Sequence, residues 1–135
     1  MTGGMEQVQR VYSGAAWEKQ AAYCRALRVG HLVFVAGTTA VDETGAVVGR
    51  GDVEAQAAFI FQKIGRALGE CGSSLKDVVR TRMYVIRRSD FTGAVQAHGR
   101  VFEGVDPVAT CVQVSALIDS ELLIEIEVDA IVRSG

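Results

Sequence analysis

Residues 106–132, DPVATCVQVSALIDSELLIEIEVDAIV, decide the fold of this chain. Two strand-like runs flank a turn, and the second run separates its residues by parity. One parity class is apolar: Leu122, Ile124, Ile126, Val128, Ala130 and Val132. The other class consists of Leu123, Glu125, Glu127, Asp129 and Ile131. Because strand side chains alternate between faces, the pattern predicts one apolar face and one face with three carboxylates about 7 Å apart.

A row of carboxylates needs cations, water or a ligand beside it. The nearest candidates lie in Val78–Ile86, a predicted strand rich in β-branched and aromatic residues. Arg80 and Arg82 share a face with Tyr84 there. If that face meets the carboxylates, the two rows pair across strands, as burial in an oligomer interface would require. We favour this structural role for both arginines over ligand binding.

The first part of the chain predicts three strands and a hairpin. The strands are expected at Val8–Tyr12, Ala22–Val29 and Leu32–Ala36, and the turn residues Asp42–Gly45 lead back onto Val47–Val48.

Two amphipathic helices complete the pattern. Asp52 caps the first helix, which ends at Gly72. Its apolar stripe is Val53, Ala57, Ile60, Ile64, Leu68 and Cys71. The second helix begins at Ser89 or Asp90 and has the stripe Phe91, Val95, His98 and Phe102. Pro107 marks the entry to the penultimate strand. The order β-β-β-α-β-α-β-β predicts an α+β fold, with both helices on one face of a mixed sheet and a partner on the other.

Composition narrows the class of protein. The 135 residues fit one domain, 1–135, whose first seven residues we expect to be flexible. An apolar content of 49% predicts that some apolar surface closes an oligomer interface. A net charge of −2 indicates no nucleic-acid partner.

No apolar run is long enough for a membrane span, and no signal-peptide pattern is present. Three widely spaced cysteines predict reduced thiols in a cytoplasmic protein. The sequence contains no CxxC, HxH or HExxH motif, so we expect neither a metal nor a cofactor.

Six short segments follow one another in a particular order. They are Val33–Gly37, Gly51–Val53 with Gln56, Leu75–Arg80, Asp90–Phe91, Pro107 with Thr110–Val112, and Glu125–Glu127. Their order and spacing resemble the Rid family (YjgF/YER057c/UK114), whose best-known members hydrolyse reactive enamines and imines. The resemblance covers roughly Ala22–Val132. It implies a chorismate-mutase-like architecture, a homotrimer and small-molecule clefts between subunits. Some relatives carry an endoribonuclease label, which nothing basic in this chain supports.

The chain departs from the family at Ala109. Deaminating members resemble one another in a Pro-Ala-Arg-Thr/Ser-x-Val segment, whose arginine binds the substrate carboxylate. Pro107–Val112 matches that segment, but Ala109 replaces the arginine and forms none of its charge-assisted hydrogen bonds. We therefore expect a roomier, less cationic cleft without ordinary 2-imino acid deaminase activity.

Three residues are candidates for the chemistry. Tyr23 and Arg25 share a strand face and resemble a family Tyr-x-Gln beside the ligand cleft. Arg25 is predicted either to bind an anion or to form an ion pair. Glu125 matches the first glutamate of a family Glu-x-Glu that places the hydrolytic water. It is predicted either to act as a general base or to form an interface salt bridge.

Four further residues have two readings each. His98 lies on an apolar helix stripe. It is predicted either to be a core residue or to line the cleft as an acid or base. Thr38 and Thr110 are predicted either to offer hydroxyls to a polar ligand or to have a structural role, such as capping a strand end. Cys111 is a reactive thiol or, as free cysteine more often is, a small buried hydrophobe.

Three functions remain open. The first is a small-molecule-binding trimer without ordinary deaminase activity. The second is a hydrolase or deaminase for a different enamine, imine or amide-like substrate, using Arg25 and Glu125. The third is a regulatory or chaperone-like interaction protein.

Overall fold

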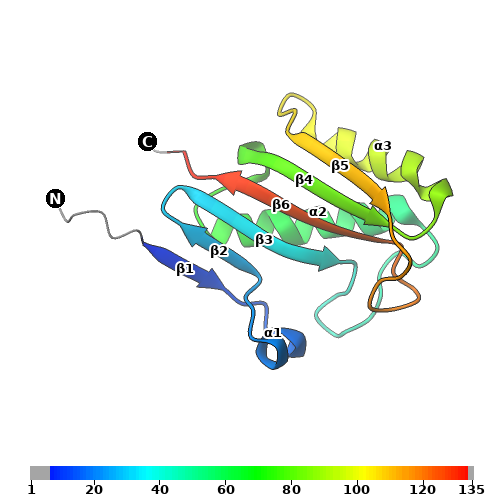
Figure 1. The fold of residues 1–135 in the computed structure, drawn as a ribbon, viewed down its shortest axis with the longest axis horizontal. Coiled ribbons are helices and arrows are strands. Elements are labelled where there is room, and N and C mark those ends of the chain that lie inside the picture. The colour runs from blue at the N-terminus through cyan, green and yellow to red at the C-terminus, as the bar shows by residue number, and fades with distance from the viewer. Residues whose placement is uncertain (1–6, 134–135) are drawn as a thin grey trace.

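Strand β6 (Ile124–Ile131) lies at the centre of a six-stranded mixed sheet of order β1-β2-β3-β6-β4-β5 (Figure 1). It pairs antiparallel with both β3 (Leu32–Thr39) and β4 (Val78–Val85). The computed structural model describes residues 7–133. The expected flexible start, except for Gln7, lies outside the described residues.

The remaining strands extend the sheet on both sides. Strands β1 (Val8–Val11) and β2 (Ala26–Val29) continue it beyond β3, both by antiparallel pairing. Strand β5 (Val108–Gln113) pairs in parallel with β4 and forms the opposite edge. The two long helices α2 (Val53–Glu70) and α3 (Phe91–Phe102) cover one face, as Figure 1 shows. The predicted α+β class and helix layer are therefore confirmed.

The core lies between this helix layer and the apolar parity class of β6. Ile124 and Ile126 are fully buried, whereas the acidic residues between and beyond them are only half-buried. Every residue of the stripe predicted for α2 is buried, and the Asp52 carboxylate accepts the backbone N–H of Ala55 at 3.1 Å. No helix among residues 7–133 is long and apolar enough to cross a membrane.

The structure corrects the boundaries near the N-terminus. The predicted strand Ala22–Val29 is shorter, because β2 begins at Ala26. The chain before it forms a helix that the sequence analysis missed, α1 (Ala16–Ala21), which ends where Ala22 adopts a left-handed conformation with φ of 59°. Short 3-10 turns at Leu75–Asp77 and Arg88–Asp90 also precede β4 and α3.

The predicted stripe of α3 is wrong at one position. Val95 is 58% exposed, and the helix instead buries the small side chains of Ala94 and Ala97 together with Phe102. Small residues allow close approach of the helix to its neighbours. The same closeness is seen at Gly93, where an added Cβ would lie 2.6 Å from a Val53 methyl carbon.

Gln56 links α2 to the segment that leads into β6. It is fully buried, accepts the Leu123 N–H at 2.8 Å and donates to the Glu121 carbonyl at 3.0 Å. Gln56→Leu leaves both backbone groups without a partner and should lower the free energy of unfolding by about 1–3 kcal/mol. Urea denaturation measures this, and Gln62→Leu on the exposed side of α2 is the matched control. Equal stability of the two variants would contradict the predicted role of Gln56.

Candidate functional site

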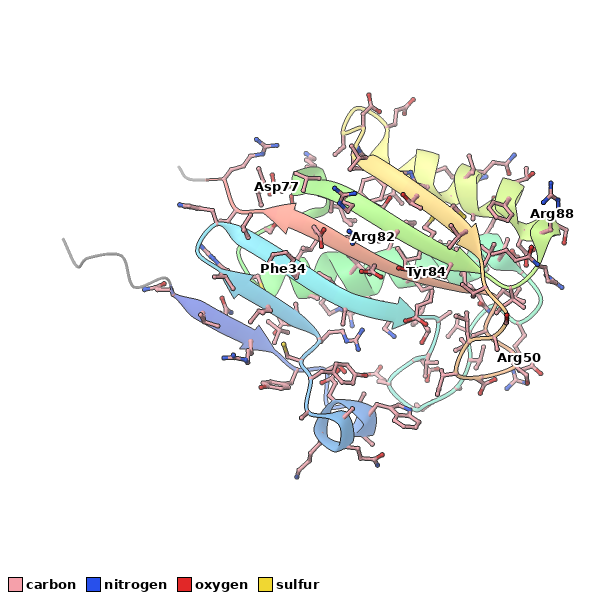
Figure 2. All side chains as sticks on the ribbon, in the orientation of Figure 1. Phe34, Arg50, Asp77, Arg82, Tyr84 and Arg88 are labelled. Carbon is pink, nitrogen blue, oxygen red and sulfur yellow. The ribbon has the colours of Figure 1, made fainter. Side chains whose placement is uncertain are left out.

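The open face of the sheet has a charged centre (Figure 2). Arg82 and Glu127 are register partners, and their Nη1 and Oε2 atoms are 3.4 Å apart. The Tyr84 hydroxyl donates to Glu127 Oε1 at 2.5 Å, which raises the pKa of Tyr84. Asp129 lies 3.6 Å from Arg82 and 3.7 Å from Arg80. The predicted cross-strand pairing of the two rows is confirmed for Glu127 and Asp129.

Glu125 belongs to the same row but differs from its neighbours. Among residues 7–133 its carboxylate has neither a hydrogen bond nor an ion pair within the distances that define them. Burial raises the pKa of Glu125, the Arg25 charge opposes this, and the Glu127 charge adds to it. A half-buried carboxylate with a raised pKa and no partner in the chain binds a proton more strongly than an ordinary one, which suits general-base chemistry.

A bulge in β3 makes room for this carboxylate. The register between β3 and β6 shifts between Val35 and Thr38, and Thr39 becomes the partner of Glu125. Gly37 lies in the shifted segment, directly beneath the carboxylate: a Cβ added to Gly37 would overlap Glu125 Oε2. Glycine is therefore the residue that this close approach requires.

Arg25 forms hydrogen bonds to the bulge. Its Nη1 donates to the Gly37 carbonyl at 2.7 Å and to Thr38 Oγ1 at 3.0 Å, and its Nε lies 3.3 Å from Glu18 Oε2. The Tyr23 ring lies 5.7 Å from the guanidinium carbon. The structure thus brings Tyr23, Arg25 and Glu125 together. It also pairs Arg25 with Glu18, in agreement with the predicted alternative in which Arg25 forms an ion pair.

Glu18 anchors α1 to this arrangement. Burial raises the pKa of Glu18, but hydrogen bonds from Ser13 and Arg25 outweigh burial and lower it. Ser13 donates through both its backbone N–H and its hydroxyl. Glu18 is therefore satisfied within the chain.

Lys63 is a second cation at the bulge, and the sequence analysis missed it. From α2 its Nζ donates to the carbonyls of Thr39 at 2.8 Å and Val41 at 2.9 Å. Burial and the nearby Arg25 charge lower the pKa of Lys63. The one signal for Lys63 in the sequence is its position three residues after Ile60, which places it on the side of α2 that faces the sheet.

His98 lies on the opposite side of the sheet from Glu125. Its Nε2 is 2.8 Å from the hydroxyl of buried Thr81, and its ring packs against Phe61 and Phe102. Burial lowers the pKa of His98. The structure shows the surroundings of a core histidine, and does not bring His98 and Glu125 together.

Thr38 is only 1% exposed, and its hydroxyl donates to the Ala36 carbonyl at 2.8 Å. The β5 candidates divide between the faces of the sheet. Thr110 pairs with Arg82 on the open face, whereas Ala109 and Cys111 pair with residues that face the helix layer. Burial raises the pKa of the Cys111 thiol, which disfavours thiolate chemistry.

The site residues thus form two groups within one chain. Tyr23, Arg25 and Glu125 lie around β3 and β6, whereas Ala109–Cys111 lie on β5. Strands β6 and β4 separate β3 from β5, so the two edges of the site are three strand spacings, about 14 Å, apart. Within residues 7–133 no cluster of three or more His, Cys, Asp or Glu side chains is placed to hold a metal.

Comparisons with known proteins identify the family of the chain. A family model described as endoribonuclease L-PSP matches residues 13–132. An uncharacterized protein of Streptomyces coelicolor is 37% identical over 93% of this chain and 92% of its own length. The 3-aminoacrylate deaminase RutC of Acinetobacter baylyi is 33% identical over 78% of this chain and 83% of its own.

A solved structure has the same fold. The crystal structure of a YjgF/YER057c/UK114 family member from Mycobacterium tuberculosis superposes with a TM-score of 0.84 at 40% identity. The match covers 93% of this chain and all of that one.

The raised pKa of Glu125 has a consequence for stability. The folded chain holds this proton more tightly than the unfolded chain, so wild-type stability falls as pH rises from the ordinary value of 4.5 toward the raised one. Glu125→Gln avoids this loss and should be more stable than wild type at neutral pH, with a difference that shrinks below pH 4.5. Urea unfolding across pH measures the difference. Glu43→Gln, in an exposed turn, should show no such gain; a pH-independent effect of Glu125→Gln would refute the assignment.

Proposed function

Because this chain belongs to the endoribonuclease L-PSP family, also called YjgF/YER057c/UK114, we propose that it binds a small molecule in clefts between subunits of a homotrimer. The proposal includes the loss of ordinary 2-imino acid deaminase activity. Its chorismate-mutase-like α+β fold is that of the family. The observation that carries the proposal is a half-buried, unpaired Glu125 in a chain whose Ala109 has no charge to offer.

The division of the site into two groups supports the trimer. A ligand that touches both Glu125 and Ala109 cannot do so within one chain, because the two residues lie on opposite faces of the sheet and strand β4 separates β6 from β5. A second copy brings its β5 beside the first copy's β3. The open face also exposes Phe34 and Val108, at 41% and 58%, beside the paired charges of its centre.

The surroundings of Ala109 support the loss of deaminase activity. Its register partner Thr81 is uncharged and already bonded to His98. The next cations on β4, Arg80 and Arg82, face the other side of the sheet and pair with Glu127 and Asp129. Nothing on these two strands therefore replaces the guanidinium that a substrate carboxylate would need.

A second candidate function follows from Glu125 itself. Glu125 is placed to take a proton from water whose oxygen attacks the carbon of a C=N bond, while the nitrogen gains a proton. Collapse of the resulting amino alcohol releases ammonia and leaves a carbonyl group. Arg25 keeps Nη2 free of hydrogen bonds to residues 7–133, so it can still contact an anionic group. This enzyme would act on an enamine, imine or amide-like substrate other than a simple 2-imino acid.

We place the protein in the cytoplasm, where its three free cysteines, Cys24, Cys71 and Cys111, would stay reduced. A regulatory or chaperone-like role stays a prediction that no observation on the site favours.

The deaminase proposal is tested with enzymatically generated 2-imino acids. Wild type should give no acceleration over the uncatalysed hydrolysis, and Ala109→Arg should gain it, because the new guanidinium restores the carboxylate contact. Gln113→Arg, which adds the same charge farther along β5, is the matched control and should stay inactive.

Turnover by wild type would overturn the first proposal and favour the second. In that case Glu125→Ala and Arg25→Ala should each abolish the activity, and full retention by both would exclude the proposed roles.

The trimer is tested by the mass in solution. Phe34→Asp puts a charge on the open face and should convert the assembly to monomers in light scattering or sedimentation. Val95→Asp places the same charge on the outward side of α3, where wild-type Val95 is 58% exposed, and should keep the assembly intact. A wild-type monomer, or equal behaviour of the two variants, would reject the proposed interface.

A further inference from the structure

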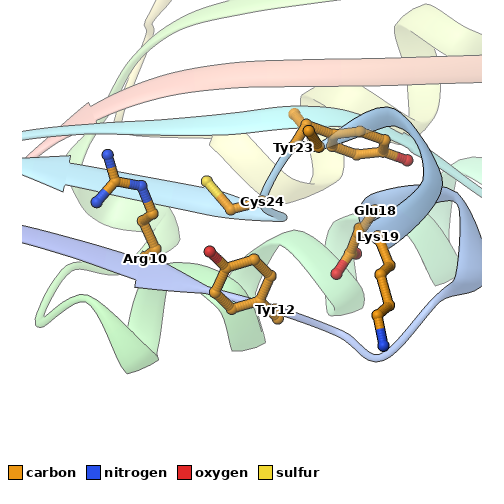
Figure 3. Close-up of a pocket in the computed structure, with 8 residues that line it drawn as sticks. Arg10, Tyr12, Glu18, Lys19, Tyr23 and Cys24 are labelled. Atoms are coloured by element: carbon orange, nitrogen blue, oxygen red, sulfur yellow. The ribbon is translucent and has the colours of Figure 1, made fainter.

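A hollow lies between β1, α1 and the segment that leads into β2 (Figure 3). Its volume is about 510 Å³, within the range of small-molecule sites. Six of its lining residues carry the argument: Arg10, Tyr12, Lys19, Ala22, Tyr23 and Cys24. Of these, only Tyr23 was a candidate from the sequence.

Two cations of this hollow have no protein partner. Within residues 7–133, neither Arg10 nor Lys19 forms a side-chain hydrogen bond or an ion pair. The one acid in the lining, Glu18, is already bonded to Ser13 and Arg25. The hollow therefore presents two uncompensated positive charges, which favour an anionic ligand.

Two aromatic rings supply the walls. Tyr12 is 62% exposed and Tyr23 is 38% exposed, although both are large enough to favour burial. Figure 3 shows Arg10 and Lys19 on either side of the Tyr12 ring. This arrangement suits a flat molecule that lies against the rings and carries a negative group at each end.

The backbone at the hollow is strained. Ala22 has φ of 59° and ψ of 53°, a left-handed conformation that a residue with a Cβ rarely adopts. This residue ends α1 and turns the chain so that Tyr23 and Cys24 line the hollow. Strain of this kind collects at binding sites, where the surrounding structure enforces it.

The hollow lies next to residues of the Glu125 site. Ala36 lines it, and the next residue, Gly37, lies beneath the Glu125 carboxylate. Tyr23 also lines the hollow, and the centre of its ring lies 5.7 Å from the guanidinium carbon of Arg25, a residue of the Glu125 site. A ligand in the hollow would therefore extend toward Glu125.

We propose that this hollow binds a planar organic dianion, with Arg10 and Lys19 as the two anion-binding groups and Tyr12 and Tyr23 as the walls. The proposal rests on the small-molecule role stated above and names its ligand class. The charge missing at Ala109 is supplied from β1 and α1, at a different wall of the site.

Three probes of one aromatic body test the charge requirement by calorimetry. They are para-phenylenediacetate, with two carboxylates, phenylacetate, with one, and phenylacetamide, with none. The dianion should bind about tenfold more tightly than the monoanion, and the amide most weakly. Backbone amide NMR shifts on adding the dianion should concentrate in residues 10–24 and 36.

Matched variants test the two cations. Arg10→Gln and Lys19→Gln should each weaken dianion binding about tenfold, to the level of phenylacetate, and leave phenylacetamide unchanged. Arg88→Gln and Lys76→Gln remove exposed cations that do not line the hollow and should change nothing. Thermal unfolding of each variant checks that the fold is intact.

Three outcomes overturn the proposal: equal binding of the three probes, no binding at millimolar concentration, or equal losses in the control variants. Its failure is separable from that of the proposed function. The imine assay and the solution mass test the deaminase and trimer statements without reference to Arg10 or Lys19, whereas the probe series tests these residues whether or not the protein is catalytic.

Discussion

The alternation along β6 is the constraint on which the rest of the structure depends. Because β3 and β4 both pair with β6, its parity decides which side chains of three neighbouring strands face the helices. A slip of one residue would put Glu125, Glu127 and Asp129 into the core and Ile126 outside it. The acids must stay on the open face, and Arg82 then has to pair with them. The apolar core and the charged centre are two results of one pattern.

A second layer of order comes from cations that bind backbone carbonyls. The segment after the bulge of β3 offers the carbonyls of Gly37, Thr39 and Val41, which accept from Arg25 or Lys63. These contacts fix a stretch of chain that has left the regular ladder. The Glu125 carboxylate lies above that stretch, and no group among residues 7–133 donates a hydrogen bond to it. Around the bulge, the described polar groups thus have partners within the chain, whereas the Glu125 carboxylate is left without one.

Local pattern predicted the parity of β6, the buried stripe of α2 and the pairing of Arg82, because each depends on spacing within one or two elements. Local pattern did not predict the contacts that long side chains make between elements far apart in the sequence. The partner of Arg25 is a carboxylate on α1, a helix that the sequence did not predict, and Lys63 donates to the Thr39 carbonyl of β3 from α2. Spacing of large apolar residues predicts Val95 on the stripe of α3, but the helix packs closely and buries the smaller Ala94 and Ala97 instead. The surroundings of Glu125 come from a glycine and a bulge, neither of which has a signature in hydrophobic pattern.

The placement of charge also explains how a family cleft can lose an arginine and keep its glutamate. A half-buried carboxylate is stabilised when cations lie nearby, and here Arg25 supplies that charge from the position just before β2 rather than from the edge strand β5. Arg25 is itself paired with Glu18, and among the residues that line the hollow Arg10 and Lys19 are the cations without a protein partner in residues 7–133. In the proposed site, the anion-binding charge therefore lies at β1 and α1 and not at β5. A ligand for such a site must place its negative charge against β1 and α1, and its reactive or polar end toward Glu125. In this proposal Ala109 leaves room for the body of the ligand and does not bind its charge.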